Sequence, residues 1–304
     1  MTNSSAAARR FERLAATPLR TVGPASGLGL GSFVASLRDL GAHREMLGLL
    51  VRRDLKAKYK DSALGLFWSL ARPLMQLAIY FVVVGQFLQA ARGIPDFAVY
   101  IFAGLVAVGL FTEIVVGATG SILSNSGLVK KVYVPRELFP LASVGSAIFN
   151  FGMQLIILFG ATLLVGAFPW HVEILYVFPS VALLLVFGTA VGLFTSALNV
   201  YLRDVQYLVE VATMVLFWAS PVVYSWQMVS QLLGPGIALE IYTDNPLTLA
   251  VLGFQKAFWV AGADAVQPDD LLLRMLVALG IGLVLLFAAH RAFLRLQGDF
   301  AQEM

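Results

Sequence analysis

Cysteine is absent from the sequence, and histidine occurs only three times. Without cysteine the chain has no disulfide, no thiolate metal site and no cysteine nucleophile. His43, His171 and His290 are far apart in the sequence and fall on different predicted segments. We therefore expect neither a metal centre nor a cofactor bound by this chain.

Charged residues are also scarce. Asp, Glu, Lys and Arg make up 13% of the 304 residues, hydrophobic residues make up 59%, and the mean hydropathy is +0.82. A soluble domain has about a quarter charged residues and roughly half apolar ones. A water-soluble chain of this length could not cover its surface with so few charges. Lipid must therefore be the solvent for most of the protein.

The motifs of energy-coupled and hydrolytic enzymes are missing as well. The sequence contains no G-x-x-x-x-G-K-[ST] loop for nucleotide phosphates, no G-x-S-x-G and no H-E-x-x-H. No inverted repeat relates the two halves, which disfavours a secondary transporter. If the chain transports a solute, the free energy is expected to come from another subunit.

The first sixty residues have two different patterns. Residues 1–32 are rich in Ala, Ser, Gly and Arg and lack the apolar core of a cleaved signal peptide, so we expect a disordered cytosolic tail. Residues 33–62 predict an amphipathic helix, with apolar side chains at Leu47, Val51 and Leu55 and a basic stripe beside them. A helix of this kind lies in the membrane interface, with its cations toward anionic headgroups.

Six later stretches are long enough to cross a membrane. A transmembrane helix needs about 20 mostly apolar residues to cross about 30 Å of hydrocarbon. The six stretches are residues 66–89, 97–123, 139–168, 174–200, 207–224 and 271–293. We therefore predict an all-α polytopic membrane protein whose transmembrane domain occupies residues 63–304.

The segment between the last two predicted spans is apolar only in patches. It is interrupted by Gly234-Pro235-Gly236 and by Asn245-Pro246, and neither patch is long enough to cross. Non-helical backbone at membrane depth is tolerated only inside protein or beside a water-filled cavity. We predict a pair of short re-entrant or interfacial helices here, and a lid lying flat on the extracellular membrane surface is the alternative.

The distribution of Lys and Arg predicts the orientation. One side carries most of the basic residues: Arg9, Arg10, Arg13, Arg20, Arg38, Arg44, Arg52, Arg53, Lys56, Lys58, Lys60, Arg72, Lys130, Lys131, Arg136, Arg203, Arg291 and Arg295. The other side has only Arg92, Lys256 and Arg274, together with acids that we interpret as solvated loop residues. Both termini are therefore expected in the cytosol.

Glu113 is the only carboxylate deep within a predicted span. An acid in a membrane is a functional candidate by default, for example in proton coupling. Near Thr112 and Thr119, the same side chain could instead be hydrogen-bonded inside the helix bundle. The sequence leaves both interpretations open.

Four ordered segments of the chain resemble the permeases of ABC-2 type transporters, in particular those that export O-antigen, teichoic acid and other lipid-linked cell-envelope polysaccharides. The segments are LVRRDLKAKYKDSALGLFW at 50–68 followed by RPL at 72–74, SGLVKKVYVPRELFP at 126–140, NVYLRDV at 199–205, and SPVVY at 220–224 with NPLT at 245–248. Together they extend over roughly residues 47–250, and the tail before Phe33 has no counterpart in the family pattern.

The resemblance implies a homodimeric pore of two six-helix halves. Two copies of a separate nucleotide-binding subunit, which holds the ATP and Mg²⁺, would drive it. Surrounding membrane lipids are partners, and no nucleic acid is expected.

Residues implied to couple to the ATPase lie on the interfacial helix and on two cytosolic loops: Arg52, Arg53, Asp54, Lys56, Lys58, Lys130, Lys131, Tyr133, Pro135, Arg136, Glu137, Arg203 and Asp204. Pro135 and Pro140 restrict the backbone of the first loop, which suits a stiff connector. Alternatively, the loop cations only enforce topology.

Candidate contacts to a lipid-linked substrate are of two kinds. Cations near the cytosolic leaflet attract a diphosphate by charge-assisted hydrogen bonds, which suggests Arg52, Arg53, Lys56 and Arg72. Aromatic faces grip sliding sugar polymers, although aromatic residues also pack helices and form membrane-interface belts. The aromatic candidates are Tyr80, Phe81, Phe87, Phe217, Trp218, Tyr224 and Trp226.

We therefore expect a pore-forming permease subunit of a polysaccharide exporter and not an enzyme. The excess of Arg over Lys, with abundant Ala, Gly and Val, is typical of a GC-rich genome and suggests a galactan on polyprenyl diphosphate as cargo. An ABC-2 permease for a drug or a free lipid is the first alternative. The second is a membrane enzyme acting on polyprenyl-linked sugars, which the lack of clustered acids disfavours.

Overall fold

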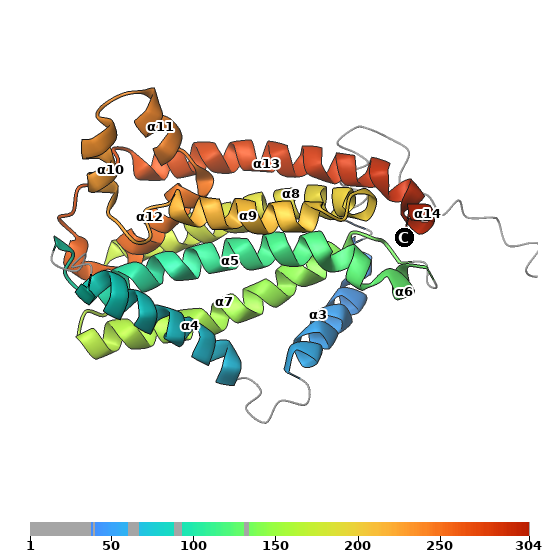
Figure 1. Ribbon diagram of the computed structural model, residues 1–304, viewed down its shortest axis with the longest axis horizontal. Coiled ribbons are helices and arrows are strands. Elements are labelled where there is room, and N and C mark those ends of the chain that lie inside the picture. The colour runs from blue at the N-terminus through green and yellow to red at the C-terminus, as the bar shows by residue number, and fades with distance from the viewer. Residues whose placement is uncertain (1–37, 39, 60–66, 88–92, 131–133, 304) are drawn as a thin grey trace, which may run out of the picture. The chain divides into compact units, whose positions relative to one another are not determined.

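The computed structural model describes residues 38, 40–59, 67–87, 93–130 and 134–303 (Figure 1). The predicted tail at 1–32, the start of the predicted interfacial helix and the candidate residues Lys131 and Tyr133 lie outside these ranges. Residues 42–304 form one compact unit, separate from residues 1–41. The described part of this unit is helical and contains no strand.

Among the described residues, four helices are long and apolar enough to cross a membrane. They are α5 (Phe97–Ser124), α7 (Leu138–Val165), α8 (Val177–Tyr201, preceded by the 3₁₀ turn η3 at Val172–Tyr176) and α13 (Leu271–Leu296). Their bounds lie within a few residues of the spans predicted at 97–123, 139–168, 174–200 and 271–293. The all-helical, multi-pass prediction is confirmed at this level.

The first and fifth predicted spans are shorter helices. The first is α4 (Phe67–Ile79), which contains Pro73 and continues as the π-helical segment η1 (Tyr80–Phe87). The fifth is α9 (Val205–Trp218), which ends at Trp218 instead of at residue 224. Ser220 and Pro221 follow in a turn, and Pro cannot continue a helix. At 1.5 Å per residue, α9 is about 21 Å long, less than the hydrocarbon thickness.

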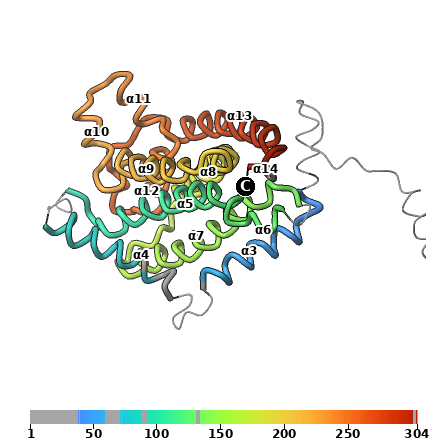
Figure 2. Tube along the Cα trace, turned by 45° about the vertical axis from the view of Figure 1, so that its right-hand side comes forward, coloured from blue at the N-terminus to red at the C-terminus, as the bar shows by residue number. Residues whose placement is uncertain are grey.

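Helix α5 is the centre of the bundle. In its most apolar window 78% of the residues are buried, against 22% to 28% in the other three long helices. Figure 2 shows α5 between α7 on one side and α8 and α9 on the other. Helix α8 approaches it closely through a glycine pair, Gly188 and Gly192, spaced four residues apart. A Cβ atom at Gly192 would lie 2.7 Å from the Cβ of Ala118 on α5. Small residues of this spacing let membrane helices pack backbone to backbone.

Three helices, not two, connect α9 to α13. They are α10 (Trp226–Leu233), α11 (Ile237–Thr243) and α12 (Pro246–Phe258). Ser225 and Asn245 cap α10 and α12 by accepting hydrogen bonds from the first-turn backbone N–H groups of Met228 and Leu247. Helix α12 is buried almost throughout, against α5 and α8, whereas α10 and α11 are largely exposed.

The predicted cytosolic loops lie at one end of the bundle. Figure 1 shows α6 (Ser126–Val129) and α14 (Phe300–Glu303) together at this end, with α10 and α11 at the opposite end. The loop at 201–205 lies at the α14 end as well, because it joins the end of α8 to the start of α9. The bundle therefore presents both predicted cytosolic loops and its C-terminal helix on one side.

Candidate functional site

Helix α3 (Arg44–Tyr59), the described part of the predicted amphipathic helix, packs on α7. Leu50 is buried, and Val51 lies against Gly145 of α7, where an added Cβ would come within 2.7 Å of Val51 Cγ2. Glycine at 145 thus permits the close approach of the two helices. The apolar face predicted from the sequence is the face that packs, and Arg52 and Lys56 are exposed on the remainder of the helix.

Arg53 connects α3 to the end of α5. Its Nη2 donates to Asp54 Oδ1 at 2.7 Å and to Asn125 Oδ1 at 2.6 Å. Asn125 immediately follows α5 and precedes α6, and its own side-chain amide donates to the Ser121 carbonyl. A hydrogen-bonded cation therefore joins α3 to the residue that immediately precedes the first predicted coupling loop.

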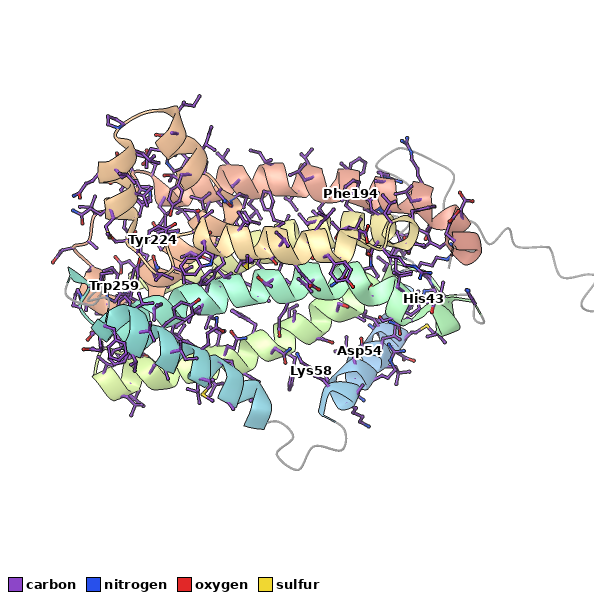
Figure 3. All side chains as sticks on the ribbon, in the orientation of Figure 1. His43, Asp54, Lys58, Phe194, Tyr224 and Trp259 are labelled. Carbon is purple, nitrogen blue, oxygen red and sulfur yellow. The ribbon has the colours of Figure 1, made fainter. Side chains whose placement is uncertain are left out.

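Further along α3, Lys58 (Figure 3) is half-exposed and contacts a residue of α5. Its Nζ lies 3.4 Å from Glu113 Oε1, and Asn150 Nδ2 of α7 donates to both Glu113 oxygens at 3.2 and 3.1 Å. Glu113 is about 16 Å along the axis from the end of α5, roughly half the depth of the hydrocarbon. The structure therefore favours the hydrogen-bonded interpretation of Glu113. Its partners are Lys58 and Asn150, whereas Thr119 bonds to Val115 O and Thr195.

The first predicted coupling loop, residues 126–137, ends in two residues with inward contacts. Lys130 is exposed and Pro135 is half-buried. The Arg136 guanidinium lies over the Phe300 ring, 5.6 Å from its centroid. Glu137 is buried, and its Oε1 lies 3.6 Å from His290 Nε2 of α13. In the second loop, Arg203 and Asp204 are exposed at the same end of the bundle.

The structure brings four of the candidate aromatic residues together and separates the others. The Tyr80 and Phe217 rings are 5.9 Å apart, Phe217 meets Trp218 at 5.2 Å, and the Tyr224 hydroxyl donates to the Trp218 carbonyl at 2.7 Å. These four form a continuous row from η1 across α9, called here the aromatic row. Phe81 and Phe87 are exposed on η1.

Trp226 lies apart from the aromatic row. Its indole N–H donates to Thr243 Oγ1 at 3.0 Å and thereby joins α10 to α11. Its role in this arrangement is to hold two short helices together. Arg72 lies in α4, but its side chain is outside the described part of the structure.

The chain was compared with known families once this geometry was established. A family model described as ABC-2 type transporter matches residues 45–259, which is well over half of the chain. The chain belongs to the ABC-2 type transporter family. All four segments on which the resemblance rested fall within or overlap the matched range.

Curated relatives match most of the chain. It is similar to a Myxococcus xanthus protein named O-antigen export system permease protein RfbA, at 27% identity over 270 residues, or 88% of this chain and 98% of that protein. Two Klebsiella pneumoniae proteins of the same name are 26% and 27% identical over 221 residues, 72% of this chain and 82% of each relative. This ABC-2 protein is thus a multi-pass membrane permease and not an enzyme, and permeases of the family generally work with an ABC ATPase.

Sequence reasoning missed an ionic cluster at the α11 end of this ABC-2 permease. Arg274 Nη1 of α13 contacts Glu240 Oε2 at 2.6 Å and Asp244 Oδ1 at 2.7 Å, and its Nε donates to the Asp269 carbonyl. The interpretation of these acids as plain solvated residues is therefore incomplete. Hydrogen bonding by Arg274 lowers the pKa of Glu240. No fixed spacing could reveal the cluster, because Arg274 of α13 lies 34 and 30 residues along the chain from Glu240 and Asp244 at α11.

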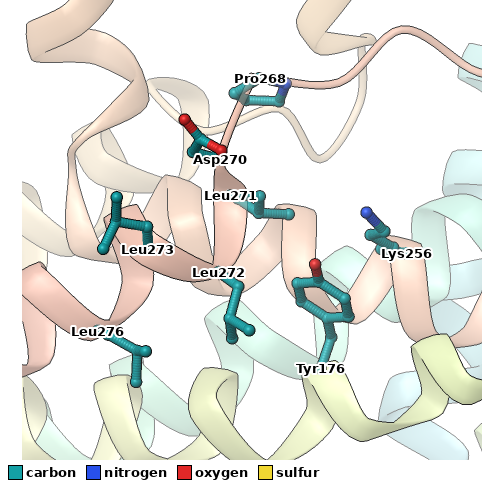
Figure 4. Close-up of a pocket in the computed structure, with 8 residues that line it drawn as sticks. All are labelled: Tyr176, Lys256, Pro268, Asp270, Leu271, Leu272, Leu273 and Leu276. Atoms are coloured by element: carbon teal, nitrogen blue, oxygen red, sulfur yellow. The ribbon is translucent and has the colours of Figure 1, made fainter.

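A pocket of about 420 Å³ lies at the same end of the permease (Figure 4). Its lining consists of Tyr176, Lys256, Pro268, Asp270, Leu271, Leu272, Leu273 and Leu276. The Lys256 ammonium lies 4.6 Å from the centre of the Tyr176 ring, a cation–π contact. The pocket is formed by η3, α12 and the start of α13, and none of the residues of the aromatic row lines it.

Proposed function

We propose that this chain is the permease subunit of an ABC exporter that moves a lipid-linked cell-envelope polysaccharide across the bacterial inner membrane. The observation that carries the proposal is the similarity to O-antigen export permeases, which extends over 98% of the Myxococcus protein rather than over one motif. The hydrogen-bonded contact of α3 with the coupling loop supports the same function, because an exporter must connect its cytosolic surface to its spans.

We propose six membrane spans with both termini in the cytosol. The spans are α4 with η1, α5, α7, α8, α9 and α13, and α12 is a re-entrant helix that enters the bundle from the α11 end. The gathering of the basic loops at the α14 end supports this orientation, since Lys and Arg are retained on the cytosolic side. The domains remain those expected from the sequence: a tail at 1–32, an interfacial helix at 33–62 and a transmembrane domain at 63–304.

We propose that two copies form the pore, with α9 and α4–η1 at the interface. Within the single chain these elements expose large apolar side chains, including Met75 (66% exposed), Phe87 (74%) and Tyr207 (68%). A second copy would cover this face and place the two aromatic rows opposite each other, as walls against which sugar rings could slide.

We propose that two ATPase subunits dock at the α14 end and hold the ATP and Mg²⁺. Arg52, Lys56, Lys130 and Arg203 are exposed there or on α3 and are available to a partner. Arg52 and Lys56 are also the proposed contacts of the lipid diphosphate, whereas Arg53 and Lys58 are engaged within the protein. A lipid-linked cargo that binds Arg52 and Lys56 in competition with the ATPase subunit would alter the position of α3.

The test is reconstitution of the permease with its ATPase subunit in proteoliposomes. Polyprenyl diphosphate-linked polysaccharide, with galactan as the first polymer, should stimulate ATP hydrolysis and become protected inside inverted vesicles. Stimulation by a hydrophobic drug or a free phospholipid in place of the polymer would establish the first alternative. Chemical conversion of the lipid-linked sugar by the permease alone would establish the enzyme alternative and contradict the proposal.

A further inference from the structure

We propose that Phe300 and His290, near the C-terminus, are positioning residues that hold Arg136 and Glu137, the last two residues of the coupling loop, against α13. The inference rests on the proposed function, because it gives the fixed position of the loop a role in passing ATP-driven movement to the bundle. Both residues lie beyond the range matched by the family model, 45–259.

The first contact that holds the loop is the cation–π pair of Arg136 and Phe300. Phe300 is fully buried, and its ring makes edge contacts with Phe293 and Tyr201 at centroid distances of 5.7 and 6.0 Å. A guanidinium within about 6 Å of a ring is attracted by the negative face of the ring. Because two neighbouring rings fix its orientation, Phe300 offers Arg136 a rigid platform.

The second contact is the pair of Glu137 and His290. Their oxygen and nitrogen atoms are 3.6 Å apart, and the two side chains are only 7% and 5% exposed. Water is largely excluded from two side chains this buried, so the contact belongs to the packed interior between the start of α7 and α13. Glu137 is the last residue before α7, and His290 lies in the last third of α13.

The platform is itself anchored in the bundle. The Tyr201 hydroxyl donates to the Leu296 carbonyl at 2.6 Å, which ties the end of α8 to the end of α13. Phe293 and Phe300 also share a buried cluster with Ile122 of α5 and Leu193 of α8. Arg136 and Glu137 are thus held at two points. A displacement of these two residues would therefore be passed to α13 and α8.

Spin labelling tests the positional part of the proposal. The chain has no cysteine, so Lys130→Cys carries a single label on the exposed part of the loop. Phe300→Leu should increase the mobility of this label, because leucine keeps an apolar side chain but removes the ring. Phe254→Leu is the matched control, since Phe254 is equally buried but packs against Phe151 and Phe258 in another cluster. Unchanged label mobility in Phe300→Leu would overturn the proposal.

A double-mutant cycle in the complex with the ATPase subunit tests the functional part. Phe300→Leu should lower the polysaccharide moved per ATP hydrolysed by about threefold. Arg136→Gln should cause a similar loss, and Arg136→Lys should retain more because an ammonium also interacts with a ring. If Arg136 acts through Phe300, the double variant R136Q/F300L is no worse than F300L.

The outcomes separate this inference from the proposed function. Losses that multiply in the double variant mean that Arg136 acts independently of Phe300, which overturns the inference and leaves the exporter assignment intact. A wild-type complex whose ATP hydrolysis does not respond to any lipid-linked polysaccharide contradicts the proposed function instead. In that case the mobility of the Lys130→Cys label still decides whether Phe300 positions the loop.

Discussion

At the scale of single residues, the carboxylate of Glu113 in this permease has defined partners. Glu113, Lys58 and Asn150 belong to three different helices, α5, α3 and α7, and converge at about half the depth of the bundle. A charge in hydrocarbon is costly unless it is paired. The pairing therefore gives this carboxylate a structural role in joining three helices.

We predict that Glu113→Ala destabilises the protein by about 1–3 kcal/mol, because it leaves the buried Asn150 amide without its acceptor. Glu113→Gln should cost less, since an amide oxygen still accepts from Asn150. The midpoint of thermal unfolding in detergent measures both effects, and Glu45→Gln on the exposed surface of α3 is the control. Equal midpoints for Glu113→Ala and wild type would contradict the structural role.

The Arg274 cluster predicts a pH dependence at the α11 end. Because Arg274 lowers the pKa of Glu240, the interaction is fully present above the ordinary carboxylate pKa and is lost as the pH falls through the lowered value. A spin label at Ile237→Cys, which is exposed on α11, should become more mobile only in that acidic window. In Arg274→Gln the label should be mobile at neutral pH as well, and an immobile label there would rule out the tether.

At the scale of secondary-structure elements, close helix approach depends on glycine at particular positions. Gly192 faces Ala118 across the α5–α8 contact, whereas Gly280 on α13 has no heavy atom within 4 Å of an added Cβ. The two glycines look alike in the sequence, since both interrupt apolar helices. Only their neighbours distinguish a packing glycine from one that faces outward.

We predict that Gly192→Ala lowers stability by about 1–3 kcal/mol through overpacking against α5. Gly280→Ala should be neutral or stabilising by up to about 1 kcal/mol, because alanine is the better helix former. Thermal unfolding of both variants measures the difference. Ala118→Gly should restore stability to Gly192→Ala, and a failure to do so would show that the clash lies elsewhere.

The length and position of most elements could be predicted from the sequence. Continuous apolar runs in the sequence place α5, α7, α8 and α13 correctly. The bilayer thickness sets the length of a membrane-crossing helix, and each such helix therefore appears as an apolar run of that length. The extent of α9 was overestimated, since the residues after Trp218 are apolar yet turn at Ser220-Pro221. The buried helix α12 was recognised as too short to cross, but its position between α5 and α8 had no sequence signal.

At the scale of the whole molecule, the membrane orientation is the property most open to direct test. Lys130→Cys in the coupling loop and Ile237→Cys on α11 lie at opposite ends of the bundle. The test uses cells whose outer barrier has been removed and whose inner membrane is intact. A membrane-impermeant maleimide should label Ile237→Cys in these cells. It should label Lys130→Cys only after the cells are lysed. Labelling of Lys130→Cys before lysis would contradict the proposed topology.

The proposed dimer makes a second prediction at this scale. Met214→Cys lies on the exposed face of α9, so oxidation should yield a disulfide-linked dimer of the purified permease. Val284→Cys is comparably exposed on α13 but lies away from the proposed interface, and should remain monomeric under the same conditions. Preferential cross-linking of Val284→Cys over Met214→Cys would contradict the proposed interface and place the dimer contact on the α13 face instead.

The sequence by itself determined that the protein is a multi-pass membrane protein and where the long apolar helices α5, α7, α8 and α13 lie. These are local properties, because hydropathy, span length and the Lys/Arg bias act on each segment separately. Only the tertiary structure decided that Lys58 meets Glu113, that Arg136 meets Phe300 and that Arg274 meets Glu240. Such pairs depend on how helices far apart in the chain rotate and pack against each other. Because many contacts together set this arrangement, no single sequence segment reveals the pairs.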